Sequence, residues 1–147
     1  MKISVRSLVE YVFRSGSIES GFRTNTTLVE GTKAHQKVQK TYKETDQKEV
    51  YVHTAIDYEE MTFFIDGRCD GLLFADGEIT VDEIKSTLGD VHSITDESYP
   101  VHWAQAKLYA YMYAKEQGIE TMHVQMTYFQ VDTEHQKQFK QTLSFQQ

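Results

Sequence analysis

The stretch RCDGLLFADGEITVDEIKS, residues 68–86, decides the fold of this chain. Two runs of β-favouring residues flank the dipeptide Asp76-Gly77, which is a strong signal for a two-residue hairpin turn. Such a turn pairs residue 75 with residue 78, so the numbers of all paired residues add up to 153. The sequence therefore predicts two antiparallel strands in which Asp70 lies directly opposite Glu83.

The residues that share a face with these two carboxylates indicate a chemical site. Lys85 lies two residues beyond Glu83 on the same face, and Arg68 lies opposite it. That face continues into apolar residues that we expect to be buried: Leu72, Phe74, Ile79 and Val81. Two facing carboxylates destabilise a sheet, and a divalent cation such as Mg²⁺ or Mn²⁺ would relieve their repulsion. A set of ordinary salt bridges with Lys85 and Arg68 is the alternative, and the predicted geometry allows both.

The rest of the chain is typical of an α/β fold. The patterns predict helices over residues 4–13, 31–43 and 100–117. Ser4 is the expected N-cap of the first helix, and Gly118 is the expected stop signal of the last. The second helix has only a thin apolar face, made of Ala34, Val38 and Tyr42. We expect strands over residues 50–56, 61–67, 68–75, 78–86 and 119–131, loops over residues 15–27 and 87–97, and a polar helical tail at the end. Trp103 is expected to pack in the core, His102 to contact nucleotide or pack, and Asp82 and Asp90 to face solvent.

Composition narrows the class of protein. The chain has 147 residues, a formal net charge of -7 and one cysteine, Cys69. This length fits one domain with a sizeable core. A single cysteine excludes an internal disulfide and a multi-cysteine zinc or iron-sulfur site. No stretch approaches the roughly 20 apolar residues of a membrane span and no secretory signal is evident, so we expect a cytoplasmic protein.

The charge is divided unevenly along the chain. Residues 1–43 carry eight basic and three acidic side chains, a balance of +5, whereas the remainder has a balance of -12. This asymmetry indicates a positive surface early in the chain and carboxylates later. Lys33, Lys37 and Lys40 fall along one edge of the second predicted helix, where they could follow a DNA backbone.

Four motifs in order resemble the PD-(D/E)XK nucleases, and in particular their RecB-like branch. Asp70 followed after a hairpin by Glu83-Ile84-Lys85 is similar to the core signature. Gly31-Thr32-Lys33-Ala34-His35 resembles the Gly-x-x-x-His helix start, and Gln105 to Tyr109 matches the Gln-x-x-x-Tyr motif. The resemblance spans about residues 5–131. It departs from the family name in one place, since Cys69 stands where the proline would be.

The resemblance implies a restriction-endonuclease-like core, a central mixed sheet flanked by helices. It implies that His35, Asp70, Glu83 and the carbonyl of Ile84 hold one Mg²⁺ or Mn²⁺ ion. Lys85 would orient the attacking water, Gln105 would position water or phosphate, and Tyr109 would contact the strand or support Lys85. Lys33, Lys37, Lys40 and Arg68 are the expected DNA contacts.

The first residues, SVRSLVEYVFRSGSI, also resemble the amino-terminal nuclease module of bacterial DinG/XPD-type DNA helicases. This resemblance implies that residues 1–147 are a single nuclease domain from a longer helicase-nuclease polypeptide. No Walker A pattern is present in residues 1–147, so we expect no helicase motor within them. The resemblance implies a metal-dependent deoxyribonuclease, an exonuclease rather than an endonuclease, acting on single strands or strand ends in DNA repair or recombination. The alternative function is a catalytically silent DNA-docking module of a helicase, and a third reading is an α/β domain with surface salt bridges only.

Overall fold

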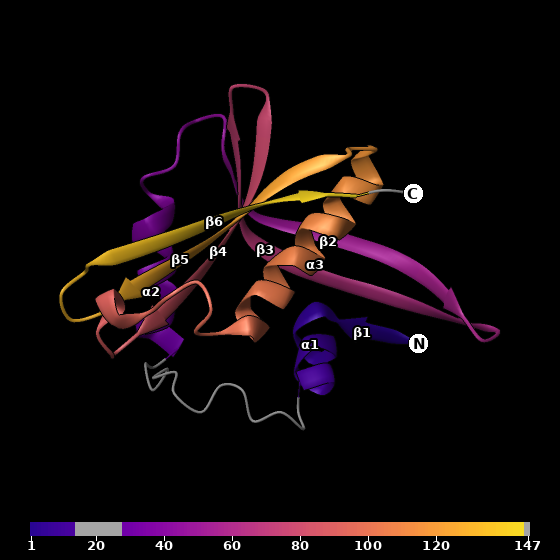
Figure 1. Cartoon of the computed structure of the whole chain (residues 1–147), viewed down its shortest axis with the longest axis horizontal. Coiled ribbons are helices and arrows are strands. Elements are labelled where there is room, and N and C mark those ends of the chain that lie inside the picture. Colours follow the sequence, from indigo (N-terminus) through magenta and orange to yellow (C-terminus); the bar gives the residue numbers. More distant parts are fainter. Residues whose placement is uncertain (14–27, 146–147) are drawn as a thin grey trace.

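The computed structural model describes residues 1–13 and 28–145, and the loop predicted over residues 15–27 lies outside them. Its elements form the expected α/β fold, with a mixed sheet flanked by helices (Figure 1). In chain order they are β1 (Lys2–Ser4), α1 (Val5–Phe13), α2 (Leu28–Gln39), β2 (Gln47–Tyr58), β3 (Met61–Ala75), β4 (Glu78–Thr87), the 3-10 helix η2 (Val91–Ser93), α3 (Pro100–Gln117), β5 (Thr121–Gln130) and β6 (Gln136–Ser144).

The long strand β3 organises the sheet. It pairs with β2 in antiparallel fashion along most of its length, with β1 in parallel near its start, and with β4 in antiparallel fashion near its end. Strand β4 then pairs in parallel with β5, and β5 pairs in antiparallel fashion with β6. The sheet is therefore mixed, as predicted.

The predicted hairpin register between β3 and β4 is confirmed. Ala75 pairs with Glu78, and the ladder runs without a slip to Gly71 opposite Asp82. Asp76 and Gly77 have φ angles of 54° and 77°, the left-handed backbone that a two-residue hairpin turn requires. The ladder ends one residue before Asp70 and Glu83, so these two residues are neighbours without being a backbone pair.

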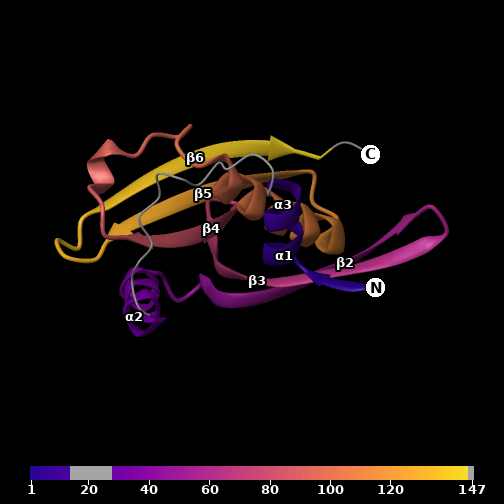
Figure 2. The same cartoon turned by 90° about the horizontal axis from the view of Figure 1, so that it is seen from below.

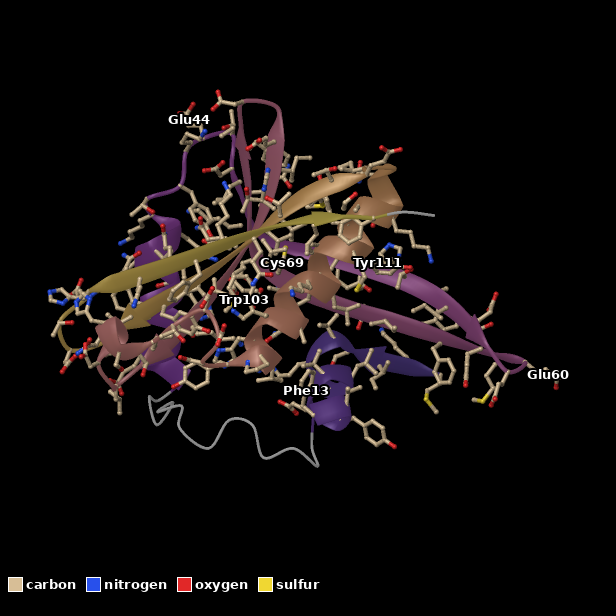
Figure 3. All side chains as sticks on the ribbon, in the orientation of Figure 1. Phe13, Glu44, Glu60, Cys69, Trp103 and Tyr111 are labelled. Carbon is tan, nitrogen blue, oxygen red and sulfur yellow. The ribbon has the colours of Figure 1, made fainter. Side chains whose placement is uncertain are left out.

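The helices lie on both sides of a strongly twisted sheet (Figure 2). Helices α1 and α3 lie on the side that holds the main core, whose fully buried side chains include Leu72, Val81, Met112, Met122, Val124 and Met126. Trp103 and Cys69 lie within this interior (Figure 3), so the packing role predicted for Trp103 is confirmed. Helix α2 covers the opposite face, where Ala34 and Val38 pack on Ile84 and Phe129.

Several predicted boundaries were wrong. Residues 61–75 form one strand instead of two, since β2 pairs across Asp66 and Gly67 without interruption. The second helix spans Leu28–Gln39 instead of residues 31–43, and Tyr42 lies in the turn that follows. The predicted helical tail is strand β6, in which alternate residues turn inward.

Other expectations for the ends of the helices were correct. The Ser4 hydroxyl caps α1 by accepting a hydrogen bond from the Ser7 N–H at 3.1 Å. Helix α3 ends at Gly118, whose φ of 69° is the left-handed C-cap conformation. Among the described residues, no helix combines the length and the apolar character needed to cross a membrane.

Candidate active site

The site forms where strands β3 and β4 part. Beyond Gly71 and Asp82, β3 stays paired with β2, while β4 stays paired with β5. Two side chains bridge the gap that opens. The Asp70 N–H donates to Glu83 Oε1 at 3.2 Å, and the Ile84 N–H donates to Asp70 Oδ2 at 2.8 Å. Each of these backbone N–H groups would bond to the neighbouring strand if the ladder continued. Here each one orients a carboxylate instead.

A cavity of about 150 Å³ lies at this point. Its lining combines residues of the strands with residues of helices from both faces of the sheet, because the parting of the strands leaves room between the two layers. The lining residues are Arg6 of α1, His35 of α2, Arg68 and Asp70 of β3, Glu83, Ile84, Lys85 and Ser86 of β4, and Gln105 and Tyr109 of α3. All predicted catalytic and metal-ligating residues line this one cavity.

Helix α2 brings His35 to the carboxylate of Asp70. His35 Nδ1 lies 3.4 Å from Asp70 Oδ1. Burial lowers the pKa of this imidazole, but the hydrogen bond and negative charge of Asp70 outweigh burial, so the net pKa of His35 is raised. One turn later, Gln39 Nε2 donates to the Asp70 carbonyl at 3.0 Å. Two side chains of α2 therefore hold the same strand residue.

The buried carboxylates fit a divalent cation. Glu83 is 3% exposed and Asp70 8% exposed. Burial, together with the charge of Asp70, raises the pKa of Glu83 well above its ordinary value. A cation bound between the two would remove this penalty, and imidazole, carboxylate and carbonyl donors suit Mg²⁺ or Mn²⁺. Across residues 1–13 and 28–145, no three His, Cys, Asp or Glu side chains form a group that could by itself hold an ion.

Lys85 is held by helix α3. Its Nζ donates to Gln105 Oε1 at 2.9 Å, and Gln105 Nε2 donates to the Tyr109 hydroxyl at 3.4 Å. Burial raises the pKa of Tyr109 to about 12, so its hydroxyl keeps its proton. The ring of Tyr109 packs so closely on Gly67 that a Cβ there would lie 2.7 Å from its Cε1 atom. The predicted support of Lys85 thus comes from Gln105, and Tyr109 supports Gln105.

The salt-bridge alternative does not describe this arrangement. In the described parts of the chain, neither Lys85 nor Arg68 forms an ion pair with Asp70 or Glu83. The two carboxylates also lie together rather than on opposite faces, as their contact through the Asp70 N–H requires. Lys85 is therefore kept beside the carboxylates by Gln105 instead of being neutralised by them.

The predicted basic row on α2 is only partly at the site. Lys33, Lys37 and Lys40 are exposed, and none of them lines the cavity. Lys37 pairs with Glu134 at 2.8 Å. Lys40 lines an adjoining groove of about 400 Å³ that shares His35 with the cavity and also contains Lys48. Arg68 is the predicted DNA contact that the cavity includes.

Two predictions around the site were wrong or incomplete. Asp82 was expected to face solvent, but it is 1% exposed and accepts hydrogen bonds from Tyr42 and Thr127 at 2.6 Å each. It points to the face opposite Glu83, since neighbouring strand residues alternate, and α2 covers that face. His102 is buried beside the Tyr128 hydroxyl at 2.9 Å, which rules out a nucleotide contact. Asp90 is exposed as expected.

Sequence reasoning missed three residues at the site. Arg6 reaches the cavity only because α1 packs beside α3, and no local pattern signals that packing. Gln39 lies one turn after His35, so an amide in that position of the helix motif could have suggested a second contact with the strand. Ser86 also lines the cavity. Its place directly after Lys85 in the sequence was the signal that could have identified it.

Comparisons with known proteins agree with this fold. A family model described as the PD-(D/E)XK nuclease superfamily matches residues 5–146. A solved structure titled "Crystal structure of SSO0001" superposes with a TM-score of 0.67 and 17% sequence identity, over 99% of this chain and 69% of that chain, which supports the fold alone. A search of curated proteins finds no match. With the mixed sheet, the hairpin and a family match over nearly its whole length, the chain belongs to the PD-(D/E)XK nuclease superfamily, whose members generally use divalent metal ions such as Mg²⁺.

Proposed function

We propose that this protein is a metal-dependent deoxyribonuclease that hydrolyses phosphodiester bonds in the cavity at the parting of β3 and β4. The observation that carries the proposal is the meeting of Asp70, Glu83 and Lys85 in one cavity. Membership of a nuclease superfamily supports the reaction class and a DNA substrate. The same chemistry could not be inferred from fold alone, because one fold supports many functions.

The proposed ligands are His35, Asp70, Glu83 and the carbonyl of Ile84, with Mg²⁺ or Mn²⁺ as the ion. A bound divalent ion polarises the phosphodiester and lowers the pKa of an attacking water. Lys85, kept in position by Gln105, places a positive charge where the phosphate becomes more negative during the reaction. Tyr109 holds the amide of Gln105 in place, so the carbonyl of that amide faces the ammonium of Lys85.

The finer proposal concerns substrate and context. We infer that the substrate is single-stranded DNA or a strand end, cut by exonuclease action during repair or recombination in the cytoplasm. Arg68 and Lys40, with Lys33 and Lys37 farther away, are the proposed contacts with the DNA backbone. We also propose that residues 1–147 are one domain of a longer polypeptide with a helicase. Labelled single-stranded, duplex and end-blocked DNA compared as substrates would test the preference.

A catalytically silent docking module is the second candidate function. The observation that favours it is that no three His, Cys, Asp or Glu side chains of the described residues form a group that could by itself hold an ion. Calorimetric binding of Mg²⁺ or Mn²⁺ together with no turnover of any DNA form would support this candidate over the nuclease.

The main experiment compares cleavage of labelled DNA in Mg²⁺ or Mn²⁺ by the protein and by site variants. Asp70→Ala and Lys85→Ala remove the proposed groups, but Asp70→Ala also leaves the buried Ile84 N–H without its acceptor. Asp70→Asn keeps an acceptor oxygen for that amide and removes only the charge, and Lys85→Met keeps the length of the side chain. We expect each of the four variants to lose roughly 100-fold or more of the cleavage rate.

Matched controls separate site effects from surface effects. Asp96→Asn and Lys140→Met make the same chemical changes at exposed positions outside the cavity. Both should cleave like the unaltered protein. Cleavage that persists in Asp70→Asn and Lys85→Met would show that the cavity is not the active site.

A further inference from the structure

Strand β2 and the first half of β3 form an arm that extends beyond the body of the molecule (Figures 1 and 2). Its tip lies at Glu60 (Figure 3). Along β2, Val52 and Thr54 are buried against the core, whereas Tyr51, His53 and Ala55 between and beside them are exposed. The arm therefore has one face on the core and one face in solvent.

The solvent face of the arm carries aromatic rings. The β2–β3 register places Tyr51 opposite Arg68 and Ala55 opposite Phe64, so these side chains share one face. Tyr51 and Phe64 are each 53% exposed. The rings of Tyr51 and His53 are stacked, with centroids 5.5 Å apart and planes 30° apart. We refer to Tyr51, His53 and Phe64 as the aromatic row.

The aromatic row begins at the active site. Arg68, the cross-strand partner of Tyr51, also lines the cavity that contains Asp70. From Arg68 to Phe64 the strand rises about 13 Å, at roughly 3.3 Å for each residue. A chain bound in the cavity can thus continue past Arg68 onto the row along the same pair of strands.

The charges around the row allow a polyanion to lie there. Asp66, the carboxylate beside the rings, accepts a hydrogen bond from the Tyr51 hydroxyl at 2.9 Å and pairs with Lys2 at 3.5 Å. Lys2 lies opposite Phe64 in the β1–β3 register. Asp57, Glu59 and Glu60 are exposed near the tip and would repel phosphates, which limits the row to the part of the arm nearest the cavity.

We propose that the aromatic row is a stacking track for single-stranded nucleic acid that leads from the cavity along the arm. The proposal rests on the nuclease function proposed above, and it adds where the strand lies outside the cavity. Exposed rings bind bases of any sequence by stacking, and a duplex keeps its base faces hidden from such rings. The mixture of rings with Arg68 and Lys2 favours this partner over an apolar protein surface.

The test measures binding of a fluorescent oligothymidylate by anisotropy, in EDTA so that no cleavage occurs. The double variant Tyr51→Ala/Phe64→Ala should bind about 10- to 100-fold more weakly than the unaltered protein, from the loss of stacking. Tyr51→Phe should bind like the unaltered protein, because it keeps the ring. Tyr58→Ala is the matched control, since Tyr58 is 63% exposed on the same strand but belongs to the opposite face.

The outcomes distinguish this track from the proposed nuclease function. A chromogenic phosphodiester that is small enough to fit within the cavity does not reach the aromatic row. The unaltered protein and the double variant should therefore cleave it at equal rates. If neither cleaves it but the double variant still loses affinity for the oligothymidylate, the track stands and the nuclease function fails. Equal affinity in the double variant and the unaltered protein, or no binding by either, overturns the track. A dimer that becomes monomeric in the double variant at equal affinity assigns the row to self-association instead.

Discussion

His102 shows how burial can decide the charge of one side chain. It lies 4% exposed in α3, with its Nδ1 atom 2.9 Å from the Tyr128 hydroxyl. Burial, with a smaller contribution from the charge of Lys85, lowers its pKa to about 3. The folded protein thus keeps this imidazole neutral, while the unfolded chain would protonate it near pH 6.5.

This difference predicts acid sensitivity. Between pH 6.5 and 3 the unfolded state binds the extra proton, so the contribution of His102 to stability is complete above pH 6.5 and decreases as the pH falls. From pH 7 to pH 4.5 the loss amounts to roughly 2–3 kcal/mol. The buried Glu83, whose pKa is raised, acts in the opposite direction, so a comparison of variants is needed.

Urea unfolding of the unaltered protein and of His102→Gln at both pH values makes that comparison. The variant should show a smaller loss of unfolding free energy on acidification. Equal losses in the two proteins would show that His102 does not govern the acid response.

At the scale of elements, the contact between Tyr42 and Asp82 joins the turn after α2 to β4. The Tyr42 hydroxyl donates to Asp82 Oδ2 at 2.6 Å, and its ring lies against Gly71, where a Cβ would collide with it. Thr127 and Gln125 bind the other oxygen of Asp82 at 2.6 and 3.3 Å. This buried network fixes α2, and with it His35, relative to the strands of the site.

Removing one hydroxyl tests the network. Tyr42→Phe leaves Asp82 Oδ2 buried without its donor, so we expect a loss of about 1–3 kcal/mol in the free energy of unfolding. Tyr58→Phe removes the same group from an exposed ring of β2 and should cost almost nothing. Denaturant titration measures both, and equal values for the two variants would contradict the role of the network.

The elements also show which local patterns were informative. Helix α3 was predicted to within a residue, because Pro100 and Gly118 act through the backbone itself. The polar sequence of β6 predicts a helix instead of a strand, because only Phe139 and Leu143 within it pack on the core. Its strand conformation comes from pairing with β5, which a local pattern does not contain.

For the whole molecule, the candidate site was predictable where backbone pairing dictates position. The hairpin arithmetic brought Asp70 and Glu83 together from the residues alone, and the resemblance supplied His35 and Gln105. The sequence does not predict the end of the ladder at Gly71, because that end depends on the pairing of β3 with β2 and of β4 with β5. It does not predict the burial of Asp82 either, because that burial depends on the turn after α2 and on Thr127 of β5. The net charge of -7 is compatible with a DNA partner, because two of the carboxylates that contribute to it are the proposed metal ligands. A bound cation would offset their charge.

The parting of β3 and β4 has a consequence for how the molecule opens. The sheet consists of two ladders: in one, β1 and β2 both pair with β3, and the other runs β4–β5–β6. Among the residues that the structure describes, backbone pairing joins the two ladders only between residues 71–75 and 78–82. Groups of strands joined so narrowly can unfold separately, as independent cooperative units. Native-state hydrogen exchange in low denaturant should therefore give two sets of opening free energies, with the lower values in the arm. A single value for all strand amides would show that the two ladders open as one.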